Sequence, residues 1–66
     1  MSDIDALKAE IKKLSARATT TKMNLHDLSE ELPISWENIL TFAQQAYDAY
    51  RDLTEARARL KQAELS

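Results

Sequence analysis

Side chains that repeat at alternating intervals of three and four residues run along almost the whole chain, and the only proline divides them into two stretches of similar length. This spacing places the repeated side chains, most of them apolar, on one stripe of an α-helix. Pro33 ends the first stretch, because proline has no backbone N–H and biases Leu32 away from the helical conformation. We therefore expect a single all-α domain over residues 1–66, an antiparallel hairpin with helices over about residues 3–32 and 36–64.

The two stripes form the predicted contact between the helices. The stripe of the first helix contains Ile4, Leu7, Ile11, Leu14, Ala18, Thr21, Leu25, Leu28 and Leu32. The stripe of the second helix contains Trp36, Ile39, Ala43, Ala46, Tyr50, Leu53, Arg57, Leu60 and Glu64. Arg57 is the one cation in the second stripe, and Glu10 lies near its level as an acidic partner that would fix the register.

The chain is too short to gain much stability from one hairpin. Chains below about 70–80 residues rarely obtain more than roughly 3–5 kcal/mol from a single core, and this chain has no cysteine for a disulfide. Self-association remains as a way to cover the stripes, so we expect a dimer that forms a four-helix bundle, with a tetramer as the alternative. The residues expected in the core or the oligomer interface are Leu14, Leu25, Leu28, Ile39, Leu40, Tyr47, Tyr50 and Leu53.

Polar residues mark the expected helix starts. Ser2 followed by Asp5 resembles a capping box. Ser35 is a good side-chain N-cap for the second helix, because its hydroxyl can accept a hydrogen bond from a free backbone N–H. Pro33 and Ser35 together predict a tight connection between the two helices.

Charge is unevenly distributed along a chain whose net charge is −2. Residues 1–22 contain five basic and three acidic side chains, residues 23–50 contain five acidic and no basic ones, and residues 51–66 contain four basic and three acidic ones. A hairpin therefore has an acidic turn end and a mildly basic open end, which favours antiparallel pairing of two hairpins. The basic residues are interspersed with acidic ones, and this argues against nucleic acid as a partner.

Several functional classes lack their characteristic residues. One histidine, no cysteine and no arrangement of a nucleophile with a base argue against an enzyme, and we expect no cofactor. No apolar stretch approaches the ~20 residues of a membrane span, and we expect a cytoplasmic protein. Tyr47 and Tyr50 suit packing better than redox chemistry. Trp36 either anchors a partner or closes the end of the bundle.

His26 and Glu30 are the weak candidates for a metal site. They are four residues apart, so they share a helix face and can pair with each other or hold a divalent cation. The preferred interpretation is a solvated acidic end of the first helix. A di-iron bundle uses Glu-x-x-His on paired helices, whereas here the histidine precedes the glutamate and no second histidine exists.

One segment carries a family resemblance. Residues 22–33, Lys-Met-Asn-Leu-His-Asp-Leu-Ser-Glu-Glu-Leu-Pro, followed by Trp36 and Glu37, resemble the signature of a Rop-like family of small proteins (DUF683). The resemblance extends over essentially the whole chain. It implies a helical hairpin that forms dimers or tetramers, and genes that accompany nitrogen-fixation clusters. The plasmid-encoded Rop hairpin binds RNA through a basic and aromatic face, but residues 23–50 of this chain offer no cation to a phosphate.

The resemblance implies a role beside nitrogenase, its cofactor assembly or its protection. Our hypothesis is a non-enzymatic assembly or adaptor protein that docks on a nitrogenase component or a cofactor-assembly protein. A Rop-type RNA-binding regulator and a metal-handling helical bundle are the alternatives. An aromatic anchor with an acidic rim suits a basic protein surface. The predicted partner-binding residues are Asp27, Glu30, Glu31, Pro33, Trp36 and Glu37.

Overall fold

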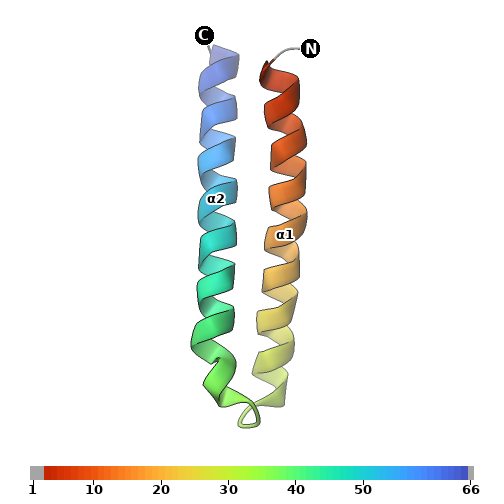
Figure 1. Cartoon of the computed structure of the whole chain (residues 1–66), viewed down its shortest axis with the longest axis vertical. Coiled ribbons are helices and arrows are strands. Elements are labelled where there is room, and N and C mark those ends of the chain that lie inside the picture. Colours follow the sequence, from red (N-terminus) through yellow and green to blue (C-terminus); the bar gives the residue numbers. More distant parts are fainter. Residues whose placement is uncertain (1–2, 66) are drawn as a thin grey trace.

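The computed structural model describes residues 3–65, and these residues form a helical hairpin (Figure 1). Helix α1 spans Asp3–Glu31, the short 3-10 helix η1 spans Trp36–Asn38, and helix α2 spans Ile39–Leu65. The start of α1 and the end of α2 lie at the same end of a rod with extents of 49 × 15 × 13 Å. The predicted all-α hairpin is confirmed. Helix α1 matches its expected bounds to one residue, whereas α2 begins three residues later than expected, because residues 36–38 form the 3-10 helix η1. The capping box proposed at Ser2 lies outside the described residues.

The turn is closed by backbone groups. The N–H of Ile34 donates to the carbonyl oxygen of Glu31 at 2.9 Å, and the N–H of Asn38 donates to the carbonyl oxygen of Ser35 at 3.0 Å. The peptide bond between Leu32 and Pro33 is cis. Ser35 adopts the left-handed conformation, with φ 62° and ψ 23°, and its side chain makes no capping hydrogen bond. The prediction of a side-chain N-cap at Ser35 was therefore wrong, because its carbonyl rather than its hydroxyl accepts the N–H of η1.

The contact between the helices is thin and depends on alanine. Ala18 of α1 packs against Ala49 and Leu53 of α2, with the half-buried Ile11 and Leu14 beside them. Two further side chains, Leu28 of α1 and Ala56 of α2, are also buried. Alanine at the contact allows close approach of the two helices, because its side chain adds little bulk beyond the backbone. The predicted burial of Ala18, Leu28 and Leu53 agrees with the structure.

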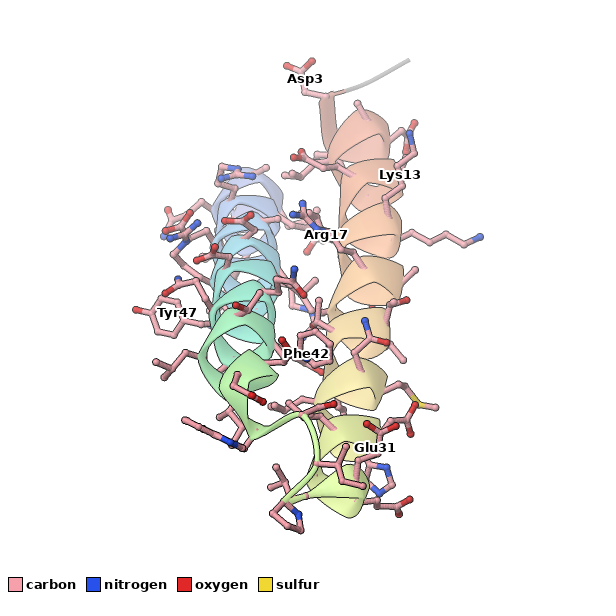
Figure 2. The ribbon with its side chains drawn as sticks, turned by 60° about the horizontal axis from the view of Figure 1, so that its bottom comes forward. Asp3, Lys13, Arg17, Glu31, Phe42 and Tyr47 are labelled. Atoms are coloured by element: carbon pink, nitrogen blue, oxygen red, sulfur yellow. The ribbon has the colours of Figure 1, made fainter. Side chains whose placement is uncertain are left out.

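The buried stripe of α2 is displaced by one residue from the predicted stripe along part of its length. Ala49 and Ala56 are buried, whereas Tyr50 is 40% exposed and Arg57 is also exposed. Phe42 is half-buried and points toward α1 (Figure 2). The physical reason is that the line with Ala49 and Ala56 is apolar throughout and has alanine at its centre, where the helices can approach closely, whereas the line with Tyr50 also contains Arg57 and Glu64.

The cross-helix ion pair follows the displaced stripe. Nη2 of Arg59 lies 3.8 Å from Oε1 of Glu10, with both side chains about half exposed. The predicted pairing of Glu10 with Arg57 was therefore wrong, although Glu10 is indeed opposite this part of α2. An exposed pair of this kind contributes at most about 1 kcal/mol.

The position of the contact can be tested at Ala56, whose exposed fraction is 0%. We expect Ala56→Leu to destabilise the protein by about 1–3 kcal/mol, because no space exists for three more carbon atoms. Thermal unfolding followed by circular dichroism measures the change. Ala58→Leu is the matched control, because Ala58 is exposed on the same helix. Equal melting temperatures for the two variants would contradict the assignment of Ala56 to the contact.

Candidate functional site

An open groove follows one side of the hairpin. Leu25 of α1 and Ala43 and Ala46 of α2 are half-buried and form its apolar floor. Tyr47 and Tyr50 stand beside this floor with 67% and 40% of their surfaces exposed. The complete lining is Lys22, Leu25, Ala43, Ala46, Tyr47, Tyr50, Arg51, Thr54 and Glu55. The groove therefore offers a mainly apolar strip with charged groups at its edge.

Two aromatic side chains of α2 point in different directions. Figure 2 shows Tyr47 pointing away from α1, whereas Phe42 points toward it. Both residues come from the first half of α2, so this segment is apolar on two faces. A surface helix needs only one apolar face to pack in a hairpin. The second face, which includes Tyr47 and Tyr50, borders the groove and keeps much of its surface exposed.

Arg51, one of the cations at the groove, already has acidic partners on its own helix. Its guanidinium donates hydrogen bonds at 3.2 Å to Oδ1 of Asp52 and lies 3.6 Å from Oδ1 of Asp48. The hydrogen bond to Asp52 raises the pKa of Arg51 above its ordinary value, and nearby carboxylates act in the same direction. The guanidinium of Arg51 therefore already pairs with two carboxylates of its own helix.

The turn end is the second exposed surface. Ile34 and Trp36 are exposed over 71% and 62% of their surfaces, and Leu32 is also exposed. The residues predicted to bind a partner all lie here, at the end of α1, in the turn and in η1, and all are exposed. We define them as the turn-end surface: Asp27, Glu30, Glu31, Pro33, Trp36 and Glu37. This geometry combines a large apolar side chain with carboxylates and leaves the binding prediction open.

His26 lies beside this surface and pairs with its neighbours on α1. Its Nε2 lies 3.5 Å from Oε1 of Glu30, and its Nδ1 lies 3.7 Å from Oδ1 of Asp27. These side chains are about two-thirds exposed. Within residues 3–65, no group of three or more histidine, cysteine, aspartate or glutamate side chains is placed to hold a metal ion. The local arrangement is that of a surface ion pair when His26 is protonated.

The sequence analysis predicted apolar residues on α2 beyond those that contact α1, but it did not predict the groove. Leu25, Tyr47 and Tyr50 were expected in the core or oligomer interface, and they line the groove. Leu40 and Ile39, also in that set, are exposed to 82% and 37%. Lys22, Thr54 and Glu55 were not identified, because polar residues on a helix surface give no signal that they border an apolar strip.

None of the helices in the part of the chain that the structure describes has the length and apolar character needed to span a membrane.

The fold and its exposed surfaces define a class of small two-helix hairpin proteins. A solution NMR structure determined by the Northeast Structural Genomics Consortium superposes on this chain with a TM-score of 0.91 at 45% sequence identity. The match covers 98% of this chain and 92% of that one. Two-helix hairpins superpose well even when they are unrelated. The 45% sequence identity is therefore the part of this match that indicates common ancestry.

Related sequences give the family. The model of the Rop-like family matches residues 2–65. A UPF0437 protein of Azorhizobium caulinodans is 58% identical over 64 residues, which cover 97% of this chain and 93% of the relative. A protein of Frankia alni, described as a UPF0437 protein in the nifX-nifW intergenic region, is 45% identical over 51 residues, covering 77% of this chain and 62% of the relative. The chain belongs to the Rop-like family.

Trp36 is the only tryptophan, so its fluorescence reports on the turn end. We expect red-shifted emission and efficient quenching by acrylamide, because most of the side chain contacts solvent. Steady-state quenching against free N-acetyltryptophanamide measures its access. A variant with Trp36→Phe and Phe42→Trp is the control and should be quenched less, because Phe42 is half-buried. Poor quenching of Trp36 in the wild-type protein would show that the turn end is covered in solution.

Proposed function

We propose that this protein is a non-enzymatic assembly or adaptor protein of nitrogen fixation that works in the cytoplasm as a homo-oligomer. It docks through the turn-end surface on a component of nitrogenase or on a protein that assembles the nitrogenase cofactor. The observation that carries the proposal is an exposed aromatic and aliphatic turn bordered by carboxylates, in a chain with a relative from a nif gene region.

The link to nitrogen fixation rests on gene position. The Frankia alni relative is described by its place between nifX and nifW. Genes placed between functionally related genes in bacteria commonly serve the same process, and the sequence resemblance to the nitrogen-fixation-associated family points the same way. This support concerns the process and leaves the partner to be identified by experiment.

Docking of a protein is the activity that suits the turn-end surface. Trp36 and its aliphatic neighbour Ile34 are more than half exposed, and exposed apolar groups rimmed by polar ones are typical of interaction sites. Tryptophan frequently contributes a large share of binding energy at interfaces. Glu31 and Glu37, both exposed, would face basic groups of the partner and direct its approach.

Self-association is supported by the second apolar face of α2. One hairpin buries only a few side chains, while Tyr47 and Leu40 remain largely exposed and Tyr50 remains 40% exposed. A second copy would remove this surface from water, and each square ångström of apolar area buried contributes about 25 cal/mol. The groove is therefore the expected surface for oligomer formation.

The oligomer prediction is tested by placing charges in the groove. We expect the double variant Tyr47→Glu, Tyr50→Glu to sediment as a monomer at concentrations where the wild type is a dimer, because burying carboxylates in an apolar interface is costly. Analytical ultracentrifugation measures the mass. Ala16→Glu is the control, because Ala16 is exposed on α1 outside the groove. A wild-type protein that sediments as a monomer would contradict self-association.

RNA binding of the Rop type has less support. Phosphate recognition requires a cluster of cations, and residues 23–50 contain five acidic side chains and no lysine or arginine. Lys22 and Arg51 border the groove, but the guanidinium of Arg51 already pairs with Asp48 and Asp52. Retention of nucleic acid is therefore an outcome to be examined in the recovery experiment.

The docking proposal is tested by recovery of tagged protein from cells growing on dinitrogen, in about 0.1 M salt, where charges act over about 10 Å. We expect a nitrogenase or cofactor-assembly protein to be recovered with the wild type, before and after nuclease treatment. Trp36→Ala should reduce recovery about tenfold or more, since loss of a central aromatic residue often costs about 2 kcal/mol. The double variant Glu31→Lys, Glu37→Lys should also reduce recovery of the partner. This loss should be larger at low salt than at high salt, because salt screens the exposed charges.

Two control variants at the open end match the loss of the aromatic side chain and the charge reversal at the turn. Leu65 is 74% exposed, so Leu65→Ala removes an exposed apolar side chain away from the turn. Asp3→Lys with Glu64→Lys changes the net charge as much as the double charge reversal at the turn. Equal loss of partner in the turn-end and open-end variants would contradict docking through the turn. Recovery of RNA without protein would favour the Rop-type regulator instead.

A further inference from the structure

Helix α1 carries an excess of positive charge in its first half, away from the turn. Residues 6–20 contain four basic side chains and one acidic one, a net charge of +3, and all five are exposed. This segment is about 21 Å long at 1.5 Å per residue. We define its basic side chains as the cationic face: Lys8, Lys12, Lys13 and Arg17.

The cations of this face are not neutralised by the hairpin. Within residues 3–65, none of the four has an ion-pair partner. Glu10, the acidic side chain of the same segment, lies 3.8 Å from Nη2 of Arg59. On α2, Asp48 and Asp52 pair with Arg51. The four cations of α1 are therefore available to carboxylates of another molecule.

Small side chains lie between these cations. Ala9, Ala16 and Thr20 follow one another at intervals of seven and four residues, so they share one side of the helix, and all are exposed. The hydroxyl of Thr20 donates to the carbonyl oxygen of Ala16 at 3.1 Å. Lys12 and Lys13 precede Ala16 by four and three residues and so stand on either side of it. Figure 2 shows Lys13 on the side of α1 away from α2. Another helix could therefore lie close to α1 between the cations.

We propose that the cationic face docks an acidic α-helix of a partner protein, which lies along α1 with its carboxylates beside Lys12, Lys13 and Arg17. This inference goes beyond docking through the turn-end surface, because it concerns another part of α1 and a partner of opposite charge. The protein then holds a basic partner at its turn and an acidic partner on the first half of α1. An adaptor with two surfaces of opposite charge can bring two different proteins together.

Charge and spacing favour an acidic helix as the occupant. Lys8 and Lys12, and likewise Lys13 and Arg17, are four residues apart, which is the spacing at which carboxylates share one face of a helix. Lysine and arginine form charge-assisted hydrogen bonds with carboxylates. Nucleic acid is the competing polyanion, but α1 contains no tryptophan, tyrosine or phenylalanine on which a base could stack.

Photocrosslinking at the centre of the cationic face tests the proposal. The chain contains no cysteine, so Ala16→Cys carries one benzophenone label per copy. The labelled protein is irradiated in an extract of cells growing on dinitrogen, in about 0.1 M salt, and crosslinked peptides are identified by mass spectrometry. We expect a crosslinked protein segment in which aspartate and glutamate outnumber lysine and arginine. The same label on Ala58→Cys, which is exposed on α2, should not give this product.

Charge reversal in the labelled protein supplies a matched comparison. Lys12→Glu with Lys13→Glu should reduce the yield of the crosslink about tenfold or more, because like charges then face each other. Arg57→Glu with Lys61→Glu changes the net charge equally at exposed positions of α2. This control should change the yield about twofold or less, because salt screens distant charges. Circular dichroism checks that both variants keep their helices, and Lys12→Arg with Lys13→Arg should retain the crosslink.

Each outcome has a definite meaning. An acidic crosslinked segment that is lost on charge reversal at Lys12 and Lys13, and kept in the control, supports the inference. Equal loss in both double variants, a basic crosslinked segment or absence of any crosslink overturns it. A product that disappears on nuclease treatment identifies nucleic acid and overturns it as well. Trp36→Ala should leave the crosslink at residue 16 unchanged, so failure of this inference and failure of docking through the turn-end surface are distinguishable.

Discussion

The close packing of alanine against the opposite helix is the interaction on which the rest of this structure depends. Ala18, Ala49 and Ala56 have almost no exposed surface, and only two helices surround them. Small side chains permit close approach of the backbones, and few larger ones pack beside them, among them Ile11, Leu14 and Leu53. Several large apolar side chains of the turn and of α2, such as Trp36, Leu40 and Tyr47, stay exposed, so the core is thin.

The thin core explains why the exposed surfaces carry the functional proposals. The hairpin leaves several large apolar side chains exposed. They are Leu40, Tyr47 and Tyr50 of α2 and Trp36 of η1. A monomer with such surface would be both weakly stable and prone to association. Self-association through the groove and partner docking through the turn-end surface assign separate roles to two parts of this area. Because the groove lies along the helices and the turn lies at their end, both can be occupied at once.

The two ends of the rod differ in charge although the two helices are similar in shape. The rod has similar helices on both sides, so shape alone would permit parallel and antiparallel pairing. The acidic side chains Glu30, Glu31 and Glu37 are concentrated at one end, and they are solvent-exposed. Exposed charges contribute little to the stability of the hairpin, but they discriminate between orientations of a second copy and between basic and acidic partners.

The sequence by itself determined the hairpin. Heptad spacing and Pro33 are local properties. They predicted two helices and a single turn, although the first three residues of the expected second helix form the 3-10 helix η1. They also placed Ala18, Leu28 and Leu53 on the stripes between the helices, where these residues are buried. The closeness of His26 to Glu30 also followed from helical spacing.

The tertiary structure decided which line of α2 faces α1. The heptad spacing continued from Trp36 leads to the line with Tyr50 and Arg57, whereas the line with Ala49 and Ala56 faces α1. The second line is also the more apolar, because it includes Phe42 and Ala63 where the first includes Glu64. How closely the two backbones approach at this line depends on the volume between them, which no single-helix pattern contains. The same limit applies to Ser35, where the path of the chain through the turn placed the backbone carbonyl rather than the hydroxyl at the start of η1. Local spacing thus specified the elements, and steric fit between them specified their faces.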